Sequence, residues 1–301
     1  GGYYQPYLSL LPAPDVIGQI EMMTSAIRTH FGKRPRGLFL TASSWTPSLI
    51  TPFTRCGMEY CLLDHRLFPA DKQQNTQNNS PFVPAIVEDK GKTITVFPYI
   101  PDDPDFTTRT PQEFYEKLTA EASSTGDSMC LLFLPITTYI KCLEKNKDGS
   151  NWFSSFIDIC NQPDSVIRLT HTAELMKRRH PHPPMYIAPN TILCDTPTGH
   201  ATKRAVTMQR DAFKIYSKMM YVNMLANGIK GDKARKKYAL QELWKAQNAE
   251  LFALEPCIPE YHNELRRIAY RKLLVAEKQT RLPGIFTDGL IQYDIDMDGR
   301  K

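Results

Sequence analysis

The chain has 301 residues, of which 42% are hydrophobic and 23% charged, a balance typical of a globular protein with a sizeable core. Its formal net charge of +5 is modest, and the excess of Lys and Arg lies mainly in residues 33–36 and 203–278, where solvated helix faces account for it. Because the basic excess is modest, we expect no nucleic-acid partner. No segment approaches the roughly 20 consecutive apolar residues of a membrane-spanning helix, so we also expect no membrane span.

The first part of the chain alternates between helical and strand-like patterns. Apolar residues at helical spacing predict a helix over 15–31, and a short apolar run predicts a strand over 36–41. A second helix is expected over 47–56, ending at Gly57, and a second strand over 59–64. This order is typical of parallel strands, whose carboxyl ends collect functional residues. Those ends are residues 41–44 and 64–66.

The middle of the chain predicts a hairpin, in which residues 82–87 pair with residues 93–97. A loop rich in Pro and Asp follows over 98–110, then a helix over 111–122 and an apolar strand over 128–134. Further helices are expected over 152–160 and 172–179. After about residue 200 the character changes to helices with charged faces, over 203–227, 233–252 and 260–281. We therefore expect an α/β part followed by a helical subdomain.

The seven cysteines are scattered and form no Cys-x-x-Cys pair, which favours free, mostly buried thiols and a reducing cytosol. We expect no metal or cofactor. His180 and His182 are separated by proline rather than placed one helical turn apart, and residues 294–299 match only half of a calcium loop. The chain lacks an initiator Met and a signal peptide and ends within a strand-like stretch, so we interpret it as a fragment.

Several short motifs follow one another in an order that resembles the family 57 glycoside hydrolases. They are Gly1-Gly2-Tyr3-Tyr4-Gln5-Pro6, Ile17-Gly18-Gln19-Ile20, the run from Phe31 to Thr41, Trp45 with Pro47, and the run from Gly57 to Asp64. Near the other end, Lys245-Ala246-Gln247, Leu265-Arg266-Arg267 and Ala276-Glu277 fit the family's helical subdomain. Residues 65–240 carry the resemblance only loosely.

The resemblance implies an incomplete TIM-like (β/α)7 barrel followed by a helical subdomain, as in the 4-α-glucanotransferases and α-amylases of this family. On that basis we expect a partial barrel region over 1–200 and a helical subdomain over 201–285. Residues 286–301 would then begin the β-domain that follows in the glucanotransferase branch, because Asp294-Ile295-Asp296-Met297-Asp298-Gly299 resembles its opening strand. The family's preceding strand would lie before Gly1.

The family cleaves α-glucans with two carboxylates, a Glu nucleophile and an Asp that acts as acid and base. Retaining chemistry needs both carboxyl groups about 5 to 5.5 Å apart. In this chain the nucleophile position is Ala42, and the apolar strand ending near Phe133 places Ile136 at the acid position. The family's Trp-His pair in the helical subdomain aligns with Ala253-Leu254. The sequence therefore predicts a catalytically degenerate member with no catalytic residues of its own.

The leading hypothesis is a non-catalytic homologue, a pseudoenzyme that binds α-glucan or an oligosaccharide or has a regulatory role. Its candidate substrate-binding residues are Tyr4, Gln5, Trp45, Asp64 and His65. Trp45 fits either a sugar-stacking ring or a core residue, and Asp64 fits either a site residue or the cap of the next turn. One alternative is an active hydrolase or glucanotransferase with relocated carboxylates, for which the candidates are Asp64, Asp102, Asp103 and Asp105. Another is a scaffold without glycan affinity.

Overall fold

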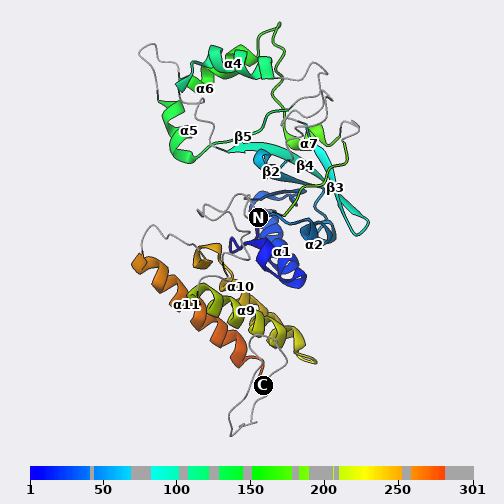
Figure 1. The fold of residues 1–301 in the computed structure, drawn as a ribbon, viewed down its shortest axis with the longest axis vertical. Coiled ribbons are helices and arrows are strands. Elements are labelled where there is room, and N and C mark those ends of the chain that lie inside the picture. Colours follow the sequence, from blue (N-terminus) through cyan, green and yellow to red (C-terminus); the bar gives the residue numbers. More distant parts are fainter. Residues whose placement is uncertain are drawn as a thin grey trace. The chain divides into compact units, whose positions relative to one another are not determined.

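The computed structural model describes residues 1–40, 44–68, 83–101, 108–121, 129–144, 151–177, 183–189, 206, 210–252 and 259–281 (Figure 1). The chain divides into two compact units. The first unit contains residues 1–35, 43–57 and 188–301, and its described part is helical. The second contains residues 36–42 and 58–187 and holds the sheet. Residues 1–35, which precede the first strand, thus belong to the same unit as the helices near the end of the chain.

The sheet of the second unit is built on parallel strands that pair in chain order. Strand β1 (Gly37–Phe39) pairs with β2 (Tyr60–Asp64), β2 pairs with β4 (Lys92–Pro101), and β4 pairs with β5 (Leu132–Phe133), all in parallel. Strand β3 (Ala85–Asp89) pairs antiparallel with β4 through a tight turn at Lys90 and Gly91, which confirms the predicted hairpin. The carboxyl ends of β1, β2, β4 and β5 therefore lie at one edge of the sheet (Figure 1).

Strand β4 extends further than the sequence predicts, since residues 98–101 were expected in a loop and instead continue the strand. Proline has no backbone N–H, so it fits a strand only where no partner needs that donor. The N–H groups of Thr95 and Ile100 donate to Glu59 and Leu131, on opposite sides of β4. Successive N–H groups of a strand point to alternate sides, so position 98 points to the same side as Ile100. On that side β3 pairing ends at Val96 and β5 pairing begins at Ile100, and Pro98 lies between them.

Other boundaries also differ from the prediction. Of the strand expected over 128–134, only Leu132–Phe133 pairs, and a helix not expected from the sequence, α5 (Ile136–Leu143), begins directly after Pro135. Helix α7 (Thr172–Leu175) is shorter than the expected helix over 172–179. Cys130 is exposed rather than buried, whereas Cys56, Cys61, Cys142 and Cys160 are buried free thiols. Among the described residues, no helix is long and apolar enough to cross a membrane.

A separate small core lies among helices α4 (Pro111–Glu121), α5 and α6 (Trp152–Cys160), which Figure 1 shows grouped together. Phe114, Phe156, Cys142 and Cys160 form its centre. Helix α6 begins with a capping box in which Asn151 and Ser154 satisfy each other's backbone N–H groups. These helices follow β4 and β5 and thereby continue the second unit beyond its sheet.

The first unit combines an early helix pair with a later bundle. Helix α1 (Ala13–Phe31), confirmed at nearly its predicted bounds, packs against α2 (Ile50–Arg55), which follows the turn η3 (Pro47–Leu49). Helices α9 (Arg210–Gly228), α10 (Lys233–Lys245) and α11 (Pro259–Lys278) pack on one another, with η5 (Ala249–Phe252) against α11. The predicted helix over 233–252 thus ends at Lys245. Leu10, from the turn η1 (Leu8–Leu10), belongs to the same core.

A buried polar network joins α1 to this bundle. The carboxylate of Asp15, only 1% exposed, accepts hydrogen bonds from Trp244 Nε1 at 3.2 Å, Asn223 Nδ2 at 2.7 Å and Gln247 Nε2. Gln19 donates to the Trp244 carbonyl and to Gln247 Oε1 and accepts from the backbone N–H of Tyr4. Burial raises the pKa of Asp15, while these three donors oppose that shift by stabilising the anion. A buried carboxylate with three donors specifies one arrangement of α1, α9 and α10.

We expect Gly18→Ala to destabilise the first unit because Gly18 lies under the Trp244 indole. A Cβ at Gly18 would lie 2.1 Å from Trp244 Cζ2, and moving the ring would break its bond to Asp15. The free energy of unfolding, measured by urea denaturation, should fall by about 1–3 kcal/mol. The matched control is Gly228→Ala at the end of α9, where a Cβ meets nothing within 4 Å. That change should be neutral or stabilise by up to about 1 kcal/mol; equal losses in both variants would contradict the packing argument.

Candidate functional site

The carboxyl ends of the parallel strands form the candidate site in the second unit. Ligands of parallel sheets bind beyond this edge, because loops and side chains from several strands converge there. We call the residues gathered at these ends the strand-end cluster: Phe39, Leu40, Asp64, His65, Arg66, Tyr99 and Phe133. Asp64 and Tyr99 are register partners on β2 and β4, so the cluster follows from strand pairing rather than from sequence proximity.

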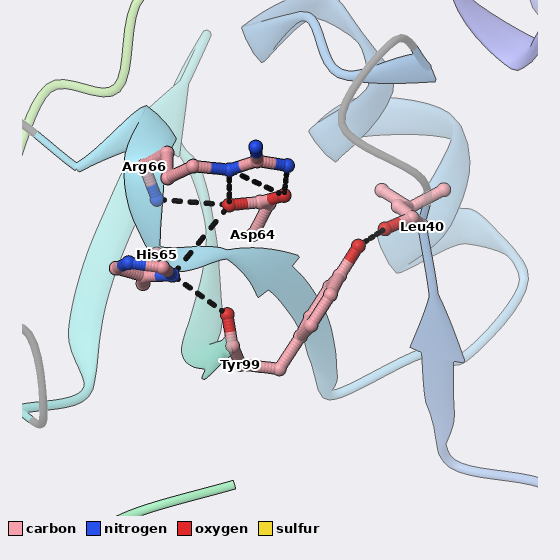
Figure 2. Close-up of polar contacts among 5 residues, drawn as sticks. All are labelled: Leu40, Asp64, His65, Arg66 and Tyr99. Atoms are coloured by element: carbon pink, nitrogen blue, oxygen red, sulfur yellow. Dashed lines mark hydrogen bonds and ion pairs between the residues drawn. The ribbon is translucent and has the colours of Figure 1, made fainter. Parts of the chain in front are cut away.

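Asp64 is fully engaged by Arg66, two residues further along the chain (Figure 2). Its side chain is 2% exposed. Oδ1 accepts from the Arg66 backbone N–H at 2.9 Å and from Nε at 3.0 Å, while Oδ2 accepts from Nη2 at 2.7 Å. Asp64 is thus the cap of the turn η4 (His65–Leu67) and the carboxylate partner of a forked guanidinium. It holds the half-exposed Arg66 in one orientation.

His65 contacts Tyr99 and Asp64 through one ring nitrogen (Figure 2). Its Nδ1 lies 3.3 Å from the carbonyl oxygen of Tyr99 and 3.7 Å from Asp64 Oδ1. Because a carbonyl oxygen only accepts, the Tyr99 contact requires the ring proton on Nδ1. The side chain is 29% exposed, so the ring is oriented by the protein and still reached by solvent.

Tyr99 connects β4 to the end of β1. Its hydroxyl donates to the carbonyl oxygen of Leu40 at 3.2 Å, within the buried part of the cluster. Burial raises the pKa of Tyr99 to about 12, and the nearby Asp64 charge adds to that rise. The phenol therefore remains a neutral donor throughout the physiological pH range, and it holds Leu40, the residue two positions before Ala42.

Three aromatic rings from three different strands contact one another in the cluster. Phe39 stacks on Phe133 with ring centroids 4.7 Å apart and an interplanar angle of 18°. Tyr99 packs on Phe39 at 5.1 Å and on Phe133 at 5.8 Å. Phe133 is nevertheless 47% exposed. The strand ends thus combine a polar group around Asp64 with an aromatic group around Phe133, and Tyr99 belongs to both.

The sequence candidates are divided between the two units. Asp64 and His65 come together in the strand-end cluster, whereas Tyr4, Gln5 and Trp45 belong to the first unit. Tyr4 is half-buried and donates its N–H to Gln19, and the exposed Gln5, at φ 52°, accepts from Ala249. Trp45 is 1% exposed, which fits the core interpretation of this ring.

The predicted catalytic positions are only partly described. Ile136 is the first residue of α5 and is 73% exposed. Ala42, the pair Ala253-Leu254, the carboxylates Asp102, Asp103 and Asp105, and residues 286–301 lie outside the described residues, as do His180 and His182. Within the described ranges, no three His, Cys, Asp or Glu side chains gather closely enough to hold a metal ion.

Five members of the cluster were not selected as candidates from the sequence: Phe39, Leu40, Arg66, Tyr99 and Phe133. Arg66 follows Asp64 by two residues, a spacing at which a capping carboxylate can meet both the backbone and the side chain of the same residue. Tyr99 was assigned to a loop, so its pairing with Asp64 was not foreseen. Phe133 lies near the end of the apolar run predicted as a strand over 128–134, and this position was the available signal for its place in the cluster.

Comparisons with known proteins agree on one family. The model of glycosyl hydrolase family 57 matches residues 1–188. The chain is 34% identical over 97 residues to the 4-alpha-glucanotransferase of Thermococcus kodakarensis, covering 32% of this chain and 14% of that enzyme. It is 30% identical over 98 residues to alpha-amylase 1 of Dictyoglomus thermophilum, covering 33% of this chain and 14% of the enzyme.

Solved structures share the fold. The 4-alpha-glucanotransferase of Thermococcus litoralis matches with a TM-score of 0.72 and 20% identity, covering 100% of this chain and 50% of that one. The alpha-amylase AmyC of Thermotoga maritima matches with a TM-score of 0.58 and 11% identity, covering 89% and 64%. The chain thus spans about half of the solved glucanotransferase. These matches confirm the predicted class, an α/β fold of the incomplete (β/α)7-barrel type.

We expect Asp64→Asn to destabilise the second unit. The amide keeps the shape but loses the charge and one acceptor, so the Arg66 fork loses its partner. The free energy of unfolding should fall by about 1–3 kcal/mol in urea denaturation at neutral pH. Glu59→Gln is the matched control, because Glu59 also pairs with an arginine, Arg36, but on an exposed surface where ion pairs contribute little. A larger loss in the control would contradict the assigned role of Asp64.

Proposed function

The chain belongs to glycosyl hydrolase family 57, and from this premise we propose that it binds α-glucans without cleaving them. The observation that carries the proposal is the run Leu40-Thr41-Ala42-Ser43-Ser44-Trp45, which contains no carboxylate where the family resemblance places the nucleophile. A retaining mechanism cannot form its glycosyl-enzyme intermediate without one. The first of the two required groups is therefore missing.

The second carboxylate is missing as well. The resemblance places the acid and base at Ile136, and helix α5, which this residue opens, contains no Asp or Glu from Ile136 to Leu143. The Ile136 side chain is apolar and largely exposed, and it cannot donate or accept a proton. An Ala and an Ile in the two positions support loss of the reaction rather than a change of nucleophile.

Asp64 is a poor replacement for either group. A nucleophile or acid needs an oxygen that can reach the substrate, whereas both oxygens of Asp64 accept hydrogen bonds from Arg66 and the side chain is 2% exposed. The geometry supports a structural carboxylate that orients Arg66. Relocated catalysis would then depend on Asp102, Asp103 or Asp105.

The ligand class is inferred from the relatives. The matching proteins are named alpha-amylases and 4-alpha-glucanotransferases, which act on α-glucans. The shared barrel fold, together with the oriented polar side chains at the strand ends of this chain, supports binding of the same ligand class. His65 and Arg66 are partly exposed there and are suited to contact sugar hydroxyl groups.

We expect the purified chain to bind maltoheptaose in calorimetry and to leave maltoheptaose and amylose uncleaved. Reducing-end release and chain-length redistribution should remain at buffer level under conditions in which the Thermococcus litoralis 4-alpha-glucanotransferase is active. Ala42→Glu alone should stay inactive, because the acid and base would still be missing.

Two results would contradict the proposal in different ways. Turnover by the wild type that is abolished by a change at Asp102, Asp103 or Asp105 would establish an enzyme with relocated carboxylates. Absence of both turnover and binding would instead establish a scaffold without glycan affinity.

A further inference from the structure

We propose that the exposed face of Phe133, supported by Phe39 and Tyr99, is a stacking surface for one glucose ring of an α-glucan. The inference rests on the proposed function, since it names the side chain on which the bound glucan lies. Neither the family match nor the sequence candidates assign this residue a role.

The Phe133 ring is held in place before any ligand binds. One face of Phe133 stacks on Phe39 at 4.7 Å, and Tyr99 contacts it at 5.8 Å. Phe39 and Tyr99 lie in strands that pair through β2, and Pro101 of β4 pairs with Phe133 itself. A ring fixed by paired strands and two neighbouring rings loses little side-chain entropy when a ligand packs on it. The site is therefore preorganised.

This supported ring is still 47% exposed. Removing apolar surface from water is favourable, so the exposed part of a ring with a rigid backing offers binding free energy. A single exposed apolar residue is common on protein surfaces and by itself indicates nothing. The location at the carboxyl end of a parallel strand, stacked on Phe39 of β1, distinguishes Phe133.

The groups on either side of Tyr99 have the two kinds of chemistry that a sugar needs. A glucose ring has an apolar face of C–H groups and a rim of hydroxyls. The C–H groups match the electron-rich face of an aromatic ring, and the hydroxyls need polar partners. The Tyr99 ring contacts Phe133, and its carbonyl oxygen contacts His65, which lies beside Asp64 and Arg66. The aromatic rings and these polar groups thus meet at Tyr99, and a site that combines both fits a sugar better than a purely apolar ligand does.

The test compares two substitutions at Phe133 by calorimetric titration with maltoheptaose. Phe133→Leu keeps an apolar side chain but removes the aromatic face, and it should weaken the affinity about tenfold. Phe133→Trp keeps an aromatic face and should retain the affinity within about threefold. The matched control is Phe31→Leu, because Phe31 is also an exposed phenylalanine, 77% exposed at the end of α1 in the first unit. Its affinity should equal that of the wild type.

A second readout makes the test independent of folding defects in the leucine variant. In Phe133→Trp, saturating maltoheptaose should change the tryptophan emission beyond the change seen in the wild type, whose tryptophans are Trp45, Trp152 and Trp244. Circular dichroism confirms that each variant is folded.

The outcomes separate the inference from the proposed function. If the wild type binds maltoheptaose and Phe133→Leu binds equally well, the stacking surface is refuted and glucan binding stands. A folded Phe133→Trp protein that no longer binds, or that binds without a change in emission, also refutes it. If the wild type binds no glucan, the proposed function fails and the inference fails with it.

Discussion

Parallel pairing of β1, β2, β4 and β5 is the constraint on which the second unit depends. Parallel strands run in one direction, so their carboxyl ends meet at one edge even when the residues there are far apart in the sequence. Asp64 and Tyr99 become neighbours through the β2–β4 register, and Phe133 reaches the same edge through β5. Because side chains alternate between the two faces of a strand, a shift by one residue would turn Tyr99 away from Phe39. The register therefore positions the contacts between strands, whereas the contacts of Asp64 with Arg66 are local to the turn after β2.

Elements with a local physical cause could be predicted from the sequence. Helix α1 is defined by its apolar spacing and by Gly32 at its end. The hairpin of β3 and β4 is defined by Gly91 and by the flanking runs rich in β-branched residues. The extension of β4 to Pro101 could not be predicted, because whether Pro98 is tolerated depends on where β3 and β5 stop pairing. For the same reason the site was found only in part. Asp64 and His65 follow an obvious strand, whereas Tyr99 belongs to a stretch that resembles a loop.

Asp64 illustrates why a carboxylate at a strand end is not in itself a catalytic sign. A catalytic pair needs two carboxyl groups that differ in protonation and keep an oxygen for the substrate. Asp64 has the opposite environment, in which one arginine occupies both oxygens and also donates its backbone N–H. Such a pair stabilises the turn after β2 and holds the guanidinium group of Arg66 at the edge of the sheet. In the proposed function, which assigns the two catalytic positions to Ala42 and Ile136, this pair supports the fold and takes no part in a reaction.

Tyr99 links the polar and the aromatic parts of the strand-end cluster. Its hydroxyl is directed to Leu40 and stays protonated, since burial holds its pKa near 12, so this group maintains the end of β1. Its ring supports Phe39 and Phe133, and its carbonyl oxygen orients His65. The hydroxyl and the carbonyl oxygen of Tyr99 thus both have partners within the cluster. In the glucan complex that we propose, the sugar contacts would therefore be made by the exposed groups that Tyr99 positions, namely the Phe133 ring and the His65 side chain.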